Sequence, residues 1–393
     1  EVANARGHLL VVDNDAGGHL AEERAREAYA RGGRLIVTKR PELTGDDWVS
    51  SEYNALGLRK SLRSSKGLFQ KIARNSMGDV VGVEAESAGF SATFARDRLG
   101  LELERSLPGG IRARWERDSI GRPVRQEIWR GSQFQNAKQY VWAVNDRLTK
   151  VVDAMRGPVE YSHDALGNLA AATYADGKVD LRMPDAVGNL FRTTDRTDRK
   201  YGPAGQLLES HDARGVTTYA YDSEGNLIKK VEPDGAVWSY AWNGAGMLKR
   251  VVRPNGYVVE FGYDPLARRT FKKYRGKTTR WIWDGNVPLH EWVERDTDAV
   301  DEDFKRAPQD DDAVAAGEKA LKAMLSGRPA NGPPLDAASA KSIEAANATG
   351  TVDAPVTWLF EPESFAPLAK LVGGQRFGIV TDHLGTPRAM FDG

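Results

Sequence analysis

The sequence predicts an all-β protein whose strands form one long, curling sheet, with an irregular insertion towards the C-terminal end. A short turn motif recurs along most of the chain at a spacing of about 20 residues, which is typical of a repeat architecture. The 40 Gly, 10 Trp, 12 Tyr and 12 Phe suit strands joined by tight turns. The mean hydropathy of −0.52 is low for a protein with one large solid core, so we expect strands with one or both faces in water.

The repeating unit consists of a strand, a turn, a second strand and a second turn. In Tyr221-Asp222-Ser223-Glu224-Gly225, the aspartate side chain can accept a hydrogen bond from the backbone two residues on, and the glycine can adopt a positive φ. The second turn is Glu232-Pro233-Asp234-Gly235, in which the proline presets φ and the glycine completes the reversal. The segment Asn226–Val231 between the turns has the length of one strand.

The first turn recurs with Asp, Asn or Gly in its first position. These first residues are Asn54, Asn75, Asp97, Asp118, Asn145, Asp164, Asp185, Gly202, Asp222, Asn243 and Asp264, with weaker copies at Asp15 and Ala30. The turn positions predicted to be structural are Asp164 with Gly167, Asp185 with Gly188, Asp222 with Gly225, Asn243 with Gly246, and Asp264, which lacks the glycine. Two strands per unit give roughly twenty strands, and an open sheet rarely exceeds ~10 before it curls. We therefore predict that residues 1–294 form one domain, a spiral sheet.

Residues 295–351 break the repeat. The segment is rich in Asp, Ala, Pro and Gly, and it lacks the alternation of polar and apolar residues that marks a strand. Its Ala, Lys and Leu content favours a short helix over Ala313–Leu325. We predict an acidic, Ala- and Pro-rich insertion loop, either a linker without a function of its own or a segment that binds a partner. Ordered sequence resumes over residues 352–393, which form a third segment.

The overall charge and the cysteine count exclude several kinds of site. Lys plus Arg and Asp plus Glu both number 55, so no net basic field favours nucleic acid or an anionic membrane. With 0 Cys, the chain offers no disulfide framework, cysteine nucleophile or thiolate metal site. No apolar run approaches the ~18 residues of a membrane-spanning helix. We expect neither a nucleic-acid partner nor a membrane span.

Two glycine-containing segments resemble nucleotide-binding loops, but each lacks a required residue. Gly276-Lys277-Thr278 ends like a phosphate-binding loop, yet Phe271 stands where the first glycine is needed. Gly244-Ala245-Gly246 lacks the third glycine of a dinucleotide-binding motif, because Lys249 occupies that position. We therefore predict no cofactor.

The histidines do not form a metal-binding pattern. They stand singly at His8, His19, His163, His211, His290 and His383, and no pair has the helical spacing of a zinc site. His163-Asp164 and His211-Asp212 coincide with repeat turns, which explain them more simply than metal binding does. Asp382-His383 supports a site hypothesis, although a turn in which the aspartate caps Gly385 explains it more simply. We predict no catalytic and no metal-ligating residue.

Three aromatic residues share one face of a predicted strand. Trp238, Tyr240 and Trp242 alternate with smaller residues, so their side chains point the same way. They could line a ligand groove. Packing across neighbouring strands, where aromatic pairs contribute ~0.2–1 kcal/mol each, is the simpler interpretation.

The repeat and two longer motifs together resemble a known family. The Tyr-Asp-x-x-Gly units resemble the YD repeats of bacterial Rhs proteins, shared more distantly with insecticidal toxin-complex C subunits and animal teneurins. FEPESFAPLAKL (Phe360–Leu371) and VTDHLGTPR (Val380–Arg388) look like the segment that closes the core of Rhs proteins. The closing-motif positions are Phe360, Pro362, Asp382, His383, Gly385 and Pro387. The chain is therefore similar to the C-terminal part of an Rhs core.

The resemblance implies a polymorphic toxin used in bacterial competition. In such proteins a hollow YD-repeat β-shell, or cocoon, encloses a variable toxic domain, and a type VI secretion system commonly delivers it. The implied partners are the rest of the shell and the enclosed C-terminal toxin domain, with secretion spike proteins and an immunity protein as further partners. The implied route is synthesis in the bacterial cytoplasm, followed by secretion or delivery into a target cell.

The resemblance also bears on enzymatic activity. The family places an aspartyl self-cleavage motif, Asp-Pro with a following Gly-Leu, downstream of the closing segment, and neither Asp264-Pro265 nor Glu361-Pro362 occupies that position. We expect that motif and the toxin beyond Gly393. The chain itself is then a structural encapsulation module, without a cofactor and without catalysis of its own. An extracellular adhesion or carbohydrate-binding repeat protein is the alternative, and an enzyme is a third hypothesis.

Overall fold

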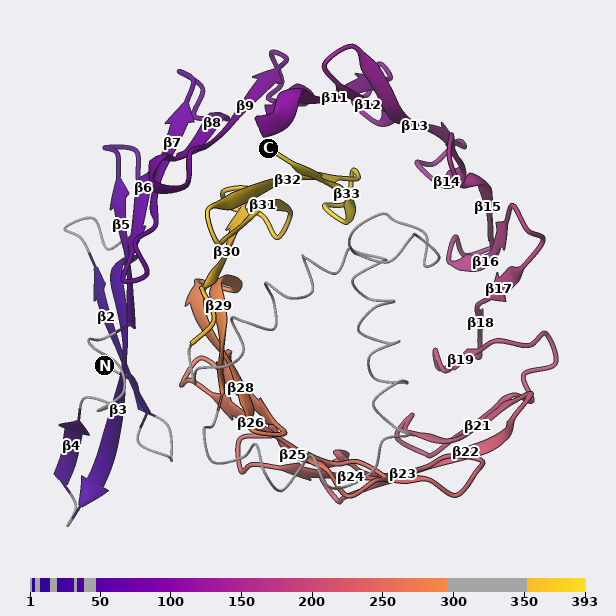
Figure 1. Ribbon diagram of the computed structural model, residues 1–393. Helices are drawn as coiled ribbons and strands as arrows, with labels where there is room; N and C mark the ends of the chain where they lie inside the picture. The colour runs from indigo at the N-terminus through magenta and orange to yellow at the C-terminus, as the bar shows by residue number, and fades with distance from the viewer. Residues whose placement is uncertain (1, 4–7, 15–19, 32–33, 39–46, 296–351) are drawn as a thin grey trace, which may run out of the picture. The chain divides into compact units, whose positions relative to one another are not determined.

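The described part of the chain is built of β-strands. The computed structural model describes residues 2–3, 8–14, 20–31, 34–38, 47–295 and 352–393, with side chains in the last two ranges (Figure 1). Within these ranges it contains antiparallel strands, two short 3-10 turns (η1, Glu86–Ala88, and η2, Pro108–Gly110) and no α-helix. The predicted all-β class is confirmed. The insertion, the helix expected over Ala313–Leu325 and the weak turn copy at Asp15 lie outside the described residues.

The strands divide between two compact units. Unit 1 comprises residues 1–112 and 261–393, and unit 2 comprises residues 113–260. Unit 1 holds β1 (Val2–Ala3), β2 (His8–Asn14), β3 (Leu20–Arg31), β4 (Arg34–Thr38), β5 (Asp47–Tyr53), β6 (Arg59–Ser64), β7 (Phe69–Arg74), β8 (Val80–Ala85), β9 (Phe90–Arg96), β10 (Glu102–Leu107), β27 (Arg269–Tyr274), β28 (Lys277–Asp284), β29 (Val287–Arg295), β30 (Val356–Phe360), β31 (Pro367–Val372), β32 (Gln375–Thr381) and β33 (Pro387–Asp392).

Unit 2 holds the remaining strands. They are β12 (Pro123–Arg130), β13 (Gln133–Trp142), β14 (Leu148–Asp153), β15 (Gly157–His163), β16 (Leu169–Tyr174), β17 (Val179–Leu181), β18 (Met183–Pro184), β19 (Leu190–Phe191), β20 (Arg199–Tyr201), β21 (Leu207–Asp212), β22 (Gly215–Tyr221), β23 (Leu227–Val231), β24 (Val237–Trp242) and β25 (Leu248–Val252). Strands β11 (Ile111–Arg117) and β26 (Val258–Tyr263) cross the unit boundaries.

Most strands pair antiparallel with the next strand along the chain. In unit 1 this pattern runs from β5 to β10 and from β27 to β33. In unit 2 it runs from β12 to β17 and from β20 to β25. Strand β3 differs, because it pairs with β2, β4 and β5. Antiparallel neighbours need only short hairpin connections, which is what the closely spaced turn motifs supply.

The repeat turns share one hairpin geometry. In the turn Asp222–Asn226, the N–H of Asp222 donates to the carbonyl oxygen of Asn226, and the N–H of Gly225 donates to that of Asp222. Gly225 has φ +84°, and the strand register shifts beside the turn. This is a type I turn followed by a glycine bulge. Because the turn and its loop length fix the register of a hairpin, the motif also determines which side chains share a face.

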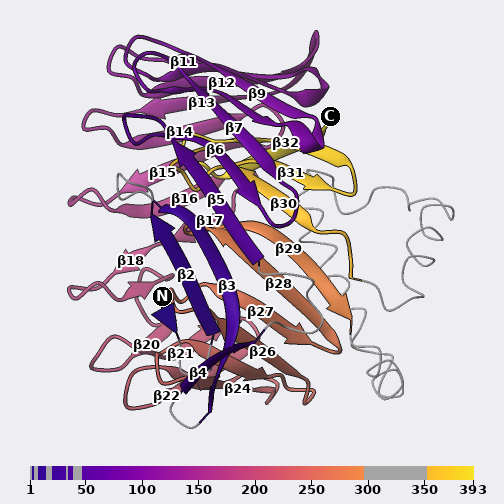
Figure 2. The same cartoon turned by 90° about the vertical axis from the view of Figure 1, so that its left-hand side faces the viewer.

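Unit 1 contains two layers of strands packed face to face. Strands β5–β10 lie alongside β28–β33 (Figures 1 and 2). Ser64 on β6 bonds to His290 on β29, and a Cβ on Gly378 of β32 would lie 3.1 Å from the Cβ of Leu107. The largest fully buried side chains are Leu62, Val83, Phe90, Ile111, His290, Leu359, Leu368 and Val380. Unit 1 therefore has the core of a sheet-on-sheet packing.

Unit 2 has a smaller core and half-buried strands. Trp115, Tyr140 and Val151 form a buried cluster, with other aromatic and aliphatic side chains packed against it. Along β24, exposed and half-buried residues alternate from Val237 to Trp242. This alternation is the wetted-strand pattern that the low mean hydropathy predicts.

The sheet of unit 2 is interrupted over residues 182–198. Strands β18 and β19 have 2 residues each and pair with each other as a separate small sheet. The repeat from Asp185 to Gly202 is the shortest in the chain, too short for two strands of the usual length and two turns. Pro184 also lacks the N–H that a ladder needs. The continuous spiral predicted from the spacing is therefore divided into separate sheets here.

The predicted domain limits at residues 294 and 352 stay a prediction, because the segment between them lies outside the described residues. Residues 352–393 do not stand apart from the repeat. They supply β30–β33 to the second layer of unit 1, and β30 pairs directly with β29.

We predict that Leu62→Ala lowers the free energy of unfolding by about 2–5 kcal/mol, because it opens a cavity in the core of unit 1. The matched control is Leu99→Ala, in the same unit, at a side chain that is 83% exposed against 0% for Leu62. The control should change the free energy by less than about 0.5 kcal/mol. Denaturant unfolding measures both values. Equal losses would contradict the assignment of Leu62 to the core.

Candidate functional site

The predicted turn residues all lie in repeat turns, and they share a pattern of hydrogen bonds. The Asp185 carboxylate accepts the N–H of Val187 at 3.0 Å and that of Asn189 at 2.9 Å. The equivalent bonds form at Asp164, Asp222, Asn243 and Asp264. The glycine partners Gly167, Gly188, Gly225 and Gly246 all have positive φ. The first residue of each turn thus accepts hydrogen bonds from backbone N–H groups that the chain reversal would otherwise leave unpaired.

Two turns of this kind do without a glycine. The turn assigned to Asn145 is opened by Ala143 instead, whose N–H donates to the carbonyl oxygen of Arg147. Its geometry differs from that of the other turns, because Asn145 and Asp146 both have a positive φ, +75° and +59°. In the turn that begins at Asp264, Ala267 occupies the glycine position with φ +62°. A left-handed conformation costs an L-residue ~1–2 kcal/mol. At the second turn, a buried ion pair at 2.7 Å between Asp264 and Arg268 offsets part of that cost.

A side chain just before the turn joins one repeat to the preceding repeat. The Tyr221 hydroxyl donates to the carbonyl oxygen of Leu207 at 2.9 Å, and Leu207 is the first residue of the strand after the preceding turn. The ladder between β21 and β22 begins further on, at Glu209 and Thr218. The side chain therefore supplies a hydrogen bond where the backbone ladder has ended. Burial raises the pKa of Tyr221, so the hydroxyl stays protonated and donates.

The same contact, which we call the inter-repeat bond, recurs with different donors. The pairs are Trp142 with Pro123 at 2.7 Å, Trp242 with Leu227 at 2.8 Å, Trp283 with Arg269 at 2.8 Å, Arg96 with Val80 at 2.8 Å, and Tyr201 with Leu190. In each pair the acceptor is the first strand residue after the previous turn. This role of the residue before the turn was not predicted from the sequence. The available signal was a long donor side chain, Tyr, Trp or Arg, recurring directly before the turn.

Some turn glycines also lie close to the preceding turn. A Cβ on Gly100 would stand 2.8 Å from Asp79 Oδ1, and one on Gly78 would stand 3.1 Å from Leu58 Cδ1. At these two glycines a side chain is thus disfavoured both by the positive φ and by the neighbour. Within each unit, consecutive repeat turns line one end of the strands. We call this end the turn rim; its turns begin at residues 54, 75, 97, 264 and 382 in unit 1, and at 118, 143, 164, 185, 202, 222 and 243 in unit 2.

The predicted closing-motif residues occupy two neighbouring turns of unit 1. Phe360 and Pro362 lie at the turn after β30, whereas Asp382, His383, Gly385 and Pro387 lie at the turn between β32 and β33. Asp382 accepts the N–H groups of Leu384 and Thr386, so the pair Asp382-His383 belongs to a repeat turn. A Cβ on Gly385 would lie 3.1 Å from that of Ala366, which shows that the two turns touch.

Arginines of the first layer of unit 1 pair with carboxylates of the second layer. Arg59 contacts Asp284 through two bonds of 2.6 and 2.9 Å. Arg105 is buried between Glu102, at 2.6 and 2.7 Å, and Glu361, at 2.7 Å. Burial lowers the pKa of Arg105, but the two carboxylates outweigh it and raise the pKa above its ordinary value. Removing one partner of such a buried pair costs ~3–5 kcal/mol, so Arg105 ties the closing motif to the first layer.

An open pocket of about 450 Å³ lies between the two layers at their turn ends. It is lined by Tyr53, Arg59, Asp284, Trp358, Phe360 and the turn Glu361–Phe365. Its charged groups Arg59 and Asp284 neutralise each other. The other two carboxylates of the lining, Glu361 and Glu363, are paired with Arg105 and Arg74, and the remaining lining mixes aromatic, aliphatic and uncharged polar residues.

His290 is completely buried between the layers. Its Nε2 lies 2.7 Å from Ser64 Oγ, and its Nδ1 lies 2.8 Å from Thr357 Oγ1. Burial lowers the pKa of His290 to about 3, and the positive charge of Lys66 acts in the same direction. A neutral imidazole donates from one nitrogen and accepts at the other, which satisfies both hydroxyls. Ser64 is buried as well, so this serine–histidine pair is a core contact rather than a nucleophile with its base.

The aromatic face of β24 is occupied by contacts within the sheet. Trp242 forms an inter-repeat bond. Lys230 Nζ and the Arg253 guanidinium lie over the Trp238 ring, at 5.8 and 5.6 Å from its centroid. These cation–π contacts favour cross-strand packing over a ligand groove.

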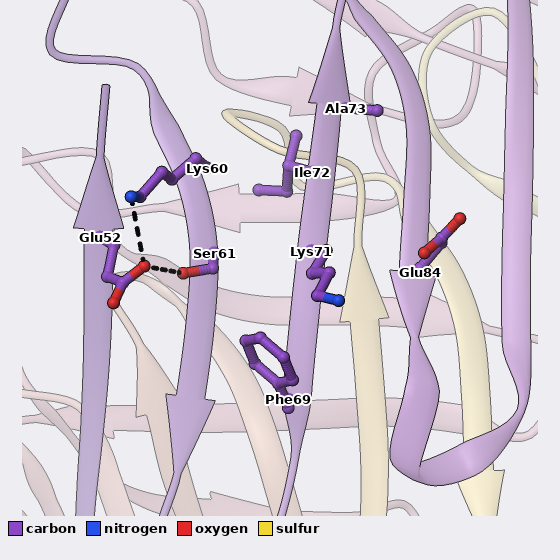
Figure 3. Close-up of a pocket in the computed structure, with 8 residues that line it drawn as sticks. All are labelled: Glu52, Lys60, Ser61, Phe69, Lys71, Ile72, Ala73 and Glu84. Carbon is purple, nitrogen blue, oxygen red and sulfur yellow. Dashed lines mark hydrogen bonds and ion pairs between the residues drawn. The ribbon is translucent and has the colours of Figure 1, made fainter. Parts of the chain in front are cut away.

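A second pocket, of about 410 Å³, lies on strands β5–β8 (Figure 3). The Glu52 carboxylate accepts a hydrogen bond of 3.0 Å from the Ser61 hydroxyl and lies 3.5 Å from Lys60 Nζ, as Figure 3 shows. The bond from Ser61, and then the charge of Lys60, hold the pKa of Glu52 below its ordinary value. The carboxylate therefore acts as an acceptor, and the site consists of polar cross-strand pairs on a wetted face.

The motif-like segments do not assemble a catalytic site. Lys277 and Thr278 begin strand β28 instead of a helix, His163 ends β15 and His211 lies in β21. Across residues 47–295 and 352–393, no three His, Cys, Asp or Glu side chains are grouped so as to hold a metal. In the part of the chain that the structure describes, no helix is long and apolar enough to cross a membrane.

Comparison with known proteins identifies the repeat. A family model described as the teneurin YD-shell matches residues 125–286. Double-stranded DNA deaminase toxin A of Burkholderia cenocepacia (strain H111) is 32% identical over 217 residues, which make up 49% of this chain and 15% of that protein. The expected resemblance to YD-repeat, toxin-associated proteins is confirmed.

A solved structure shares the fold. It is the structure of the Photorhabdus luminescens Tc holotoxin pore with a TccC3 mutation. The match covers 98% of this chain and 19% of the chain in that structure, with a TM-score of 0.57 and 12% sequence identity. At that identity the match concerns the fold alone. The chain spans less than a fifth of the length of either relative.

We predict that Tyr221→Phe lowers the free energy of unfolding of unit 2 by about 0.5–1.5 kcal/mol, because it removes one inter-repeat bond and keeps the ring. The matched control is Tyr174→Phe, whose hydroxyl bonds to Asp180 at an exposed site and should cost nearly nothing. Denaturant unfolding of both variants measures the difference. Equal effects would contradict a structural role for the bond.

We predict that acid destabilises unit 1 through His290. The pKa of about 3 in the folded chain lies below the ordinary 6.5, so the unfolded chain binds the proton first as the pH falls. The stabilisation is complete above pH ~6.5 and is lost progressively between that pH and about 3.

Stability measured by denaturant unfolding at several pH values tests this. Between about pH 7 and pH 5, the free energy of unfolding should fall by roughly 2 kcal/mol less in His290→Gln than in the wild type. Parallel wild-type and His290→Gln curves would overturn the prediction.

Proposed function

We propose that the chain is a structural encapsulation module, a stretch of β-sheet that encloses a toxic polypeptide and sequesters it for delivery. The inter-repeat bond is the observation that carries this proposal, because it holds a thin, half-buried sheet together without a thick core. The YD-shell match over residues 125–286 and the fold shared with a Tc toxin chain support the same role.

We propose that the enclosed toxin is a different segment of polypeptide and that this chain is not an enzyme. One relative is named as a DNA deaminase toxin. Zinc-dependent nucleobase deaminases bind their metal through cysteines of a Pro-Cys-x-x-Cys motif, and this chain has 0 Cys. It therefore lacks the ligands of such a centre, which supports the enclosing role for the residues present.

The delivery route extends the proposal. Synthesis in the bacterial cytoplasm, followed by secretion or delivery into a competing cell through a type VI spike with an immunity protein for the producer, is the route that the Rhs resemblance implies. For the alternative, adhesion or carbohydrate binding, the aromatic face of β24 would be the natural site. Its contacts within the sheet give that alternative no specific support.

Protease protection tests the proposal on the complete gene product that contains this chain. We expect a segment outside residues 1–393 to survive protease and to be digested when Arg105→Met loosens the two layers of unit 1. Arg214→Met, which removes an exposed pair with Asp212, is the matched control and should keep the protection. Intact mass identifies the surviving segment. Digestion of that segment at the same rate in wild type and Arg105→Met would reject encapsulation.

A further inference from the structure

The third position of most repeat turns carries an exposed aliphatic side chain. These residues are Leu56, Met77, Leu99, Leu266 and Leu384 in unit 1, and Ile120, Leu166 and Val187 in unit 2. Their exposed fraction runs from 52% for Leu266 to 86% for Leu166. Val144, at the second position of the turn opened by Ala143, is also exposed. The turn rim of each unit therefore presents a row of aliphatic tips to solvent.

The turn itself does not require these side chains. Ala204, Glu224 and Ala245 occupy the same position in three other turns. The N–H of Glu224 bonds to Asp222 at 3.0 Å, and the N–H of Val187 bonds to Asp185 at the same distance. Since the local geometry is equal with and without an aliphatic tip, the tips serve something outside the turn.

The opposite end of the strands is different. The turns there carry polar residues such as Lys66, Asp176, Arg214 and Asp234. Within residues 47–295 and 352–393, Met155 is the large hydrophobic residue of comparable exposure in those turns. An apolar row confined to one end of a sheet marks a contact surface.

The spacing of the tips indicates what covers them. Neighbouring rim turns are two strands apart, so the tips repeat every ~9.5 Å. A second rim built of the same repeat has the same period, and its tips can interdigitate along the whole row. We propose that the turn rim is an interface on which a second copy of this chain docks, rim to rim.

The charges of the rim suit contact with itself. Arg122 bonds to Asp118 at 2.7 Å and to Asp146 at 2.9 Å, so this part of the rim carries both basic and acidic groups. In a two-fold contact a residue of one copy meets a different residue of the other copy, and the reverse contact forms as well, so Arg122 of each copy can meet an aspartate of the other. A lipid surface fits less well, because it would desolvate the aspartates that stand two residues before most of the aliphatic tips.

Unit 1 already contains one contact between turns of this kind. Arg74, directly before the turn at Asn75, pairs with Glu363 in the turn after β30 at 2.8 Å. Turn ends from two layers thus meet through paired charges, beside exposed apolar residues such as Phe365. The proposed interface continues that arrangement between two copies.

Sedimentation velocity of the chain tests the proposal. We expect concentration-dependent self-association that the triple variant Ile120→Asn, Leu166→Asn and Val187→Asn weakens by about tenfold or more. The matched control is Met155→Asn, at the opposite end of the same unit, and it should associate like wild type. Glu224→Leu fills a gap in the row and should strengthen association. Circular dichroism and thermal unfolding verify that each variant is folded.

Two further measurements identify the occupant. A photo-crosslinker at position 166 should react with rim residues of the second copy. A monomeric wild type, a triple variant that associates unchanged, or crosslinks to the opposite end would each overturn the proposal. Flotation of the wild type with phosphatidylcholine–phosphatidylglycerol vesicles, lost in the triple variant, would overturn it in favour of a lipid surface.

Discussion

The inter-repeat bond is the contact on which the rest of the structure depends. A hairpin alone is marginally stable in water, and the half-buried strands of unit 2 bury little apolar surface. A donor such as the Tyr221 hydroxyl or the Trp242 indole reaches the carbonyl group where the preceding ladder has ended. Where this bond forms, a repeat is bonded to its neighbour by ladder hydrogen bonds and by one side chain. Stability in such an array comes from nearest neighbours, so the sheet can be long without being thick.

Unit 1 uses the same repeat differently, because a second layer covers its first. Leu62 and Leu368 become fully buried there, and a buried arginine, Arg105, connects the layers. His290 is held neutral between two hydroxyls. Buried charges and polar groups are costly unless they are paired, which means that the two layers fit in one arrangement. The closing motif lies at this junction.

An enclosing role places different demands on the faces and on the ends of the strands. The faces need polar and aromatic groups that tolerate partial wetting, as on β24 and around Glu52. The ends carry the turns, where an aspartate and a positive-φ glycine already fix the backbone. Their third position is free to vary, as Glu224 and Leu166 illustrate. Contact surfaces can therefore be placed on the rim without cost to the hairpin.

The sequence by itself determined the strands and their turns, because Asp-x-x-Gly fixes a hairpin through bonds between residues no more than four apart. It also predicted the fold class, the turn residues such as Asp222 and Gly225, and the wetted face of β24. It did not predict the inter-repeat bond, the turn opened by Ala143 or the break near Pro184, which depend on where the preceding repeat ends. Only the tertiary structure decided that β30–β33 cover β5–β10, and hence that His290 and Arg105 are buried. Period-two patterning shows which residues share a face, but it carries no information about which distant strand will cover that face.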